Sequence, residues 1–154
     1  MKAQKIRLAI LGLWLGAMAF FSFVVAPSAF AVLPQQQLAG ALVSRTLGIL
    51  EITGIIISSL LSFILGFEKE RGGKGYRFEQ ITLALMGLSM VFSYVAVSSR
   101  MKEMRAIFGE IALLAANDPN RIAFDRLHQY SVWLMSFNII AAIVLIVYLA
   151  RRNA

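Results

Sequence analysis

One long uncharged run constrains this chain more than any other feature. The run extends from Leu8 to Leu33 and follows a basic start that contains Lys2, Lys5 and Arg7. A helix of about 20 apolar residues is long enough to cross the ~30 Å hydrocarbon core of a bilayer. The chain is therefore predicted to enter a membrane near its N-terminus.

Composition extends this prediction to the whole chain. Hydrophobic residues make up 59% and charged residues only 15%, whereas soluble domains carry roughly 25% charged residues. Three further apolar runs follow the first one. We therefore predict an all-α membrane protein, a single domain over residues 1–154 with four transmembrane helices, at approximately 8–27, 45–67, 79–99 and 128–150.

The third and fourth helices are predicted to be longer than the membrane is thick. Residues 101–116 show apolar side chains three or four positions apart, which predicts an amphipathic helix beyond the third span. Asp118 and Pro119 have the residue types of an N-cap and a first helical position. A helix from Pro119 to Ala150 would measure ~48 Å, so both helices are expected to extend beyond the bilayer on the non-cytoplasmic side.

The orientation follows from the basic residues. With a cytoplasmic N-terminus, nine of the fifteen Lys and Arg residues lie on the inner side, which favours cytoplasmic termini in a multi-pass protein of the cell (inner or plasma) membrane. The triplet Ala29 to Ala31 also fits a signal-peptide cleavage pattern. The apolar run is longer than a typical signal peptide requires, so we expect the first helix to be retained.

Small residues indicate where the helices pack. Gly12 and Gly16 are four apart, a spacing that allows close approach of a neighbouring helix. Ser58 and Ser62 lie on a similar stripe of the second span. Pro27 is expected to end or kink the first helix near Ala26.

The polar residues of the spans are predicted to gather near one membrane face. In a four-span protein the first and third connections lie on the same side, which brings Arg45 and Glu51 near His128. Ser131 and Asn138 are seven apart and share one face of the fourth helix. These residues could form a pocket that binds an ion or solute or passes a proton. Alternatively, Glu51 pairs with a nearby basic residue, and Asn138 bonds a serine of a neighbouring helix.

Several kinds of chemistry are disfavoured. The chain has no Cys and one His, which removes thiolate catalysis and leaves few metal ligands. Hydrolase motifs such as G-x-S-x-G and H-E-x-x-H do not occur. We therefore expect no enzyme activity, no metal and no cofactor. The basic residues form short clusters between apolar runs, which favours lipid head groups over nucleic acid as their partner.

Short motifs resemble a known family. They are Trp14-Leu15-Gly16, Phe20-Phe21, Ala26-Pro27 with Phe30, Ala39-Gly40, and Phe124 with Arg126-Leu127-His128, Ser131 and Asn138. This series resembles the small four-helix membrane family that includes animal transmembrane protein 205. The resemblance implies four spans, no assigned biochemical activity, and matched positions at Pro27, His128, Ser131 and Asn138. It implies no role for Glu51.

Two functional hypotheses follow. The first is a non-catalytic accessory or interaction subunit that works in the bilayer with other membrane proteins or with further copies of itself. The second is a protein that handles a proton, a solute, a metal or haem through the polar cluster.

Overall fold

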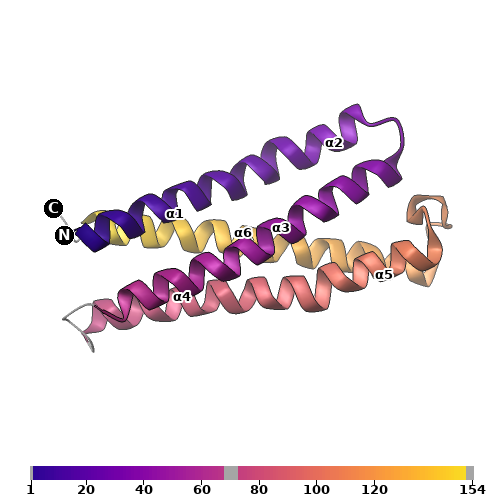
Figure 1. Ribbon diagram of the computed structural model, residues 1–154. Coiled ribbons are helices and arrows are strands. Elements are labelled where there is room, and N and C mark those ends of the chain that lie inside the picture. Colours follow the sequence, from indigo (N-terminus) through magenta and orange to yellow (C-terminus); the bar gives the residue numbers. More distant parts are fainter. Residues whose placement is uncertain (1, 68–72, 152–154) are drawn as a thin grey trace.

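A computed structural model describes residues 2–67 and 73–151 of the chain. They form four long helical rods that run up and down in turn, so that the start of α1 and the end of α6 lie together (Figure 1). All four are long and apolar enough to cross a membrane, which confirms the predicted all-α four-helix bundle. The side that faces the cytoplasm stays a prediction.

The first and third rods each contain more than one helical segment, and a short 3-10 turn precedes the fourth rod. The elements are α1 (Lys2–Phe20), the π-helical η1 (Phe21–Val25), α2 (Ala26–Val32), α3 (Gln36–Leu65), α4 (Lys74–Phe92), the π-helical η2 (Ser93–Ser98), α5 (Ser99–Phe108), the 3-10 turn η3 (Ile111–Leu113) and α6 (Pro119–Arg151). The first rod is α1-η1-α2, the second α3, the third α4-η2-α5 and the fourth α6.

The rods form a ring in which α1 packs on α3 and α6, and α4 packs on α3 and α6. α1 and α4 therefore lie across the ring from each other, as do α3 and α6. Beyond η1 the first rod continues as α2, which packs on α3, and in Figure 1 it diverges from α5 and from the first half of α6. The bundle is therefore more open at the end away from the termini.

Pro27 does not end the first helix, so the predicted end near Ala26 is wrong, although the helix changes from π to α at this point. A proline lacks the N–H of a helical hydrogen bond, and its ring crowds the carbonyl four residues before it. Here the π-helical turn η1 directly precedes Ala26 and Pro27, and the wider π register accommodates that lost bond. The helix ends instead at Val32, where Leu33 is extended, as expected for the residue before Pro34.

The amphipathic helix predicted for residues 101–116 is shorter than expected. It ends at Phe108 because Gly109 has a φ of 67°, a conformation that side-chain-bearing residues rarely adopt. A 3-10 turn follows. The predicted N-cap at Asp118 is confirmed, since its Oδ1 accepts a 2.7 Å hydrogen bond from the backbone N–H of Asn120.

The core is a column of leucine, methionine and small residues, and the outer surface is apolar. Met18, Leu65 and Leu145 are fully buried. By contrast, Leu13 is 77% and Phe23 75% exposed. Water would penalise such a surface, whereas lipid solvates it.

Candidate functional site

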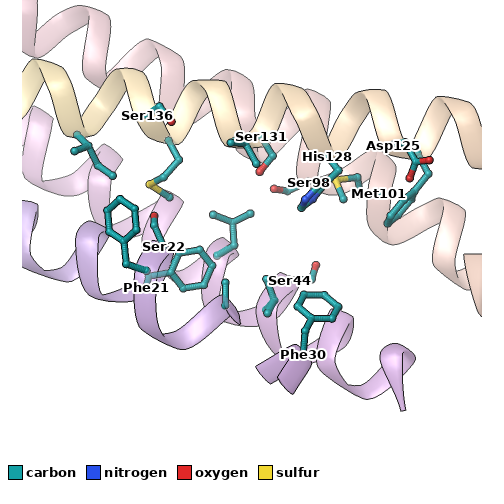
Figure 2. A pocket seen from close by; sticks show the side chains of 18 of the residues that line it. Phe21, Ser22, Phe30, Ser44, Ser98, Met101, Asp125, His128, Ser131 and Ser136 are labelled. Atoms are coloured by element: carbon teal, nitrogen blue, oxygen red, sulfur yellow. The ribbon is translucent and has the colours of Figure 1, made fainter. Parts of the chain in front are cut away.

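A cavity of about 400 Å³ lies among all four rods toward the end of the bundle away from the termini. Figure 2 shows Phe21 and Phe30 of the first rod and Ser44 of α3 on one side, with Ser131 and His128 of α6 opposite them. Small-molecule sites in proteins typically measure about 300–1,000 Å³. The volume is therefore sufficient for a small ligand.

The lining changes from apolar to charged along the cavity. Phe21 and Met135 line the end nearer the middle of the bundle, and Arg105, Asp125 and His128 line the other end. The side chain of Arg105 is half-buried, whereas Asp125 and His128 are exposed. Hydroxyl groups line the walls between the two ends, from Ser22, Ser44, Ser98, Ser131 and Ser136. The cavity thus has an amphipathic lining.

Both π-helical segments within the described residues border this cavity. η1 contributes Phe21, Ser22 and Phe23, and η2 contributes Ser98. π-helical turns cost regular hydrogen bonding and occur frequently at functional sites. Their coincidence at one cavity marks it as the best candidate for a functional site.

Glu51 lies beside the cavity lining but is used in packing. Its side chain is fully buried, and Oε1 accepts hydrogen bonds from the hydroxyls of Ser93 and Ser98, the latter at 2.8 Å. Ser98 therefore contacts both the carboxylate and the cavity. These bonds join α3 to the π-helical segment of the third rod.

The predicted cluster of polar residues is divided between several places, which corrects the sequence prediction. In the part of the chain that the structure describes, neither His128 nor Arg45 bonds to Glu51. Six residues at 3.6 per turn place Arg45 about 120° around the helix from Glu51, and it lines a separate groove with Tyr94. His128 lies on α6, across the ring from α3.

Asn138 makes the contact predicted for it. Its Nδ2 donates a 2.8 Å hydrogen bond to Oγ of Ser89 on α4 and another to the carbonyl of Leu134. The side chain is 1% exposed. This confirms the expected bond to a serine of a neighbouring helix. Ser131, on the same face of α6, is also buried but lines the cavity.

The glycine pair predicted as a packing face points outward, which is a further correction. Gly12 and Gly16 are exposed, and a Cβ on either would have no neighbour within 4 Å. The packing stripe of α1 is instead formed by Leu11, Trp14 and Met18, which are all nearly inaccessible. Successive residues are rotated by about 100°, so the glycines face away from that stripe.

The serines of α3 and Pro27 have different surroundings. Ser58 is 5% exposed and packs against Gly87, where a Cβ would lie 3.3 Å from Cβ of Ser58. Ser62 is half-buried, and Pro27 is exposed on the first rod. Of these three residues, Ser58 has the most buried position.

An ion pair inside the bundle was missed by the sequence interpretation. Nε of Arg7 lies 2.9 Å from Oε1 of Glu79, and both side chains are 1% exposed. Arg7 was interpreted only as part of the basic start. A signal was present, because Arg7, Leu11, Trp14 and Met18 share one helical stripe. That stripe is the buried face of α1.

Arg105 and Asp125 were also absent from the predicted site. The position of Arg105 four residues after Met101 places both on the same helix face, and Met101 is buried. Within residues 2–67 and 73–151, no group of three His, Cys, Asp or Glu side chains is positioned to hold a metal ion.

Comparisons with known proteins assign no activity to the chain. Residues 9–108 match the model of a family described as "Domain of unknown function (DUF4149)". A protein of Aquifex aeolicus (strain VF5), described as "Uncharacterized protein", is 43% identical over 61 residues, which is 40% of this chain and 46% of that protein. The match thus spans less than half of the relative. No solved structure matches the chain.

Proposed function

We propose a non-catalytic accessory role in the membrane for this chain, which belongs to the family described as "Domain of unknown function (DUF4149)". In this proposal the protein binds a small molecule in the cavity among its four rods. The main evidence for it is that both π-helical segments line a cavity of about 400 Å³. The volume and the mixed lining are those of a small-molecule site.

The use of the buried polar groups supports a non-catalytic role. Glu51 accepts hydrogen bonds from Ser93 and Ser98, and Asn138 donates one to Ser89. These are bonds between helices, and such bonds stabilise membrane bundles by about 0.6–2 kcal/mol each. In this proposal the hydrogen bonds to Oε1 of Glu51 and from Nδ2 of Asn138 serve the stability of the bundle.

The cellular setting belongs to the same proposal. The excess of basic residues on the membrane side that holds the termini, nine of fifteen, supports cytoplasmic termini in the inner or plasma membrane. The motif resemblance to the small four-helix family that includes transmembrane protein 205 implies four spans and assigns no biochemical activity. Association with other membrane proteins or with further copies of the chain would make the protein an accessory subunit.

Blocking the cavity tests the proposal. Ala26 is half-buried in the cavity wall, so Ala26→Phe places a ring in the space. Ala17→Phe adds the same ring to the exposed face of α1 and is the matched control. Native mass spectrometry of protein purified in mild detergent is expected to show a bound small molecule on the wild type and on Ala17→Phe only. An adduct that survives in folded Ala26→Phe would contradict the proposal.

A second candidate function is proton or solute handling through Glu51. It is favoured by one observation, the hydroxyl of Ser98, which donates to Glu51 and also lines the cavity. A proton could move between a ligand in the cavity and the buried carboxylate along this contact. A buried ionisable residue inside a span is costly and is a functional candidate for that reason.

The Glu51→Gln variant separates the two candidates. An amide retains an oxygen that accepts from both serines but cannot exchange a proton as a carboxylate does. Proton handling predicts that proton flux into proteoliposomes stops in Glu51→Gln while the fold persists. Equal flux from variant and wild type would reject this candidate and leave the binding role in place.

A further inference from the structure

Arg105 lies at the charged end of the cavity, which is the end with Asp125 and His128. Its side chain is half-buried, and its guanidinium carbon lies 5.0 Å from the centre of the Phe124 ring. On α3, a Cβ at Gly40 would lie 3.6 Å from Nε of Arg105. Gly40 thus leaves room for the guanidinium, and the aromatic face of Phe124 packs against it. The guanidinium therefore lies among α3, α5 and α6.

Arg105 has no anionic partner within the described residues. Neither a hydrogen bond nor an ion pair of the chain reaches its guanidinium there, although Asp125 borders the same cavity. A charged group that is partly removed from water is stabilised by an opposite charge. A guanidinium presents five N–H donors in a fixed fork that matches carboxylate and phosphate oxygens. The site therefore favours an anionic oxygen group as its ligand.

Asp125 does not cancel this preference. Its carboxylate is exposed, so water screens its charge, whereas Arg105 is half-buried and screened less. The Phe124 ring further favours a cation at this point. Of the two charged side chains Arg105 and Asp125 that line the cavity, Arg105 is consequently the less screened one.

The opposite end of the cavity suits a hydrocarbon chain. Phe21, Met135 and Ile139 line it, and all three lie on segments inside candidate spans. From Asp125 to Ile139 the wall of α6 measures about 21 Å at 1.5 Å per residue. One leaflet contributes about 15 Å of the hydrocarbon core. A chain of the length found in one leaflet therefore fits along the cavity.

We infer that the cavity binds a single-chain amphiphile with an anionic oxygen head group. Arg105 holds the carboxylate or phosphate, and the hydrocarbon chain extends between Phe21 and Met135. The inference rests on the proposed binding function, because it names the ligand class for that same cavity. It adds that the head group is recognised by charge and that the ligand lies with its head toward the loops between the rods.

The test measures binding of radiolabelled palmitate to the detergent-purified full chain, with hexadecanol and acetate as competitors. Palmitate tests the complete ligand, hexadecanol lacks the charge, and acetate lacks the chain. Arg105→Gln removes the guanidinium, and Arg105→Lys retains its charge. Arg126→Gln is the matched control, since Arg126 is an exposed basic residue of the same end of the bundle that does not line the cavity.

Arg105→Gln is expected to weaken palmitate binding about tenfold or more, as for loss of a charged hydrogen bond. Arg105→Lys is expected to recover part of this loss, and Arg126→Gln to bind as the wild type does. Hexadecanol is expected to compete at least tenfold less well than palmitate, and acetate not at all. Competition by acetate alone would indicate a simple anion site and overturn the inference.

Two other outcomes separate the ligand class from the binding function. Equal binding of palmitate by folded Arg105→Gln and Arg126→Gln, with loss in Ala26→Phe, would overturn the anionic head group and retain the cavity as a binding site. Palmitate binding that persists in folded Ala26→Phe would reject both the cavity and the head-group assignment.

Discussion

Arg7 and Glu79 form an ion pair across the bundle, from the first turns of α1 to the first turns of α4, with both side chains removed from solvent. The two helices are not neighbours in the ring of rods. The pair therefore ties opposite sides of the bundle together near the end where the termini lie (Figure 1).

Removing one partner of this pair should be strongly destabilising. Arg7→Met or Glu79→Leu leaves a buried charge behind, and such changes cost about 3–5 kcal/mol. The double variant should lose much less than the two single losses combined, because no charge is stranded. Unfolding in mixed detergent micelles measures these free energies. Additive losses would mean that the two groups do not interact.

The exposed pair of Arg100 and Glu103 is the control. Their side chains are 60% and 53% exposed, with 2.6 Å between Nη1 and Oε2. Solvent screens such pairs, so Arg100→Gln should change the unfolding free energy by less than about 1 kcal/mol. A larger loss would show that this segment is not exposed in the protein.

Gly54 is predicted to be intolerant of any side chain. A Cβ on Gly54 would lie 2.7 Å from Cζ2 of Trp14 and 3.1 Å from Cγ of Met90. Trp14 is itself buried, so the core must shift, at a cost of about 1–3 kcal/mol for Gly54→Ala. Thermal unfolding followed by near-ultraviolet circular dichroism would detect both the loss and a changed tryptophan environment.

The glycines on the outer face of α1 should behave in the opposite way. Gly12→Ala and Gly16→Ala meet no atoms within 4 Å, and alanine favours a helix by up to about 1 kcal/mol over glycine. Both variants should therefore be as stable as the wild type or more stable. A marked loss in thermal unfolding would indicate that another helix covers this face.

A substitution at Gly109 would test the effect of backbone conformation on stability. Its φ of 67° ends α5, and a Cβ would have open space around it. Gly109→Ala should destabilise the protein by about 1–3 kcal/mol through backbone strain. Ala106→Gly, on the exposed face of α5, exchanges the same two residue types without creating that strain. It should therefore destabilise the protein less. An equal or smaller loss for Gly109→Ala, measured by chemical denaturation, would contradict the positive φ.

The hydrogen bond between Asn138 and Ser89 should contribute modestly. Ser89→Ala and Asn138→Ala each remove one partner of a 2.8 Å contact between α4 and α6. Their coupling in a double-mutant cycle is expected to be about 0.6–1.7 kcal/mol, as for other hydrogen bonds between membrane helices. The same micelle unfolding assay measures it, and zero coupling would rule the contact out.

The sequence alone determined the number of long helices, their apolar outer surface and the N-cap at Asp118. These properties depend on local composition and on residues close together in the chain. It also predicted a serine partner for Asn138, because a buried amide in lipid has few alternatives.

Only the tertiary structure decided which side of each helix faces a neighbour. When nearly every position is apolar, periodicity cannot separate a lipid face from a packing face. Gly12 and Gly16 were consequently assigned to the wrong side, and Arg7 was not recognised as buried. Depth along the helix placed Arg45 near Glu51, whereas rotation about the helix axis separates them. The cavity likewise depends on how the rods pack, because residues of all four rods line it.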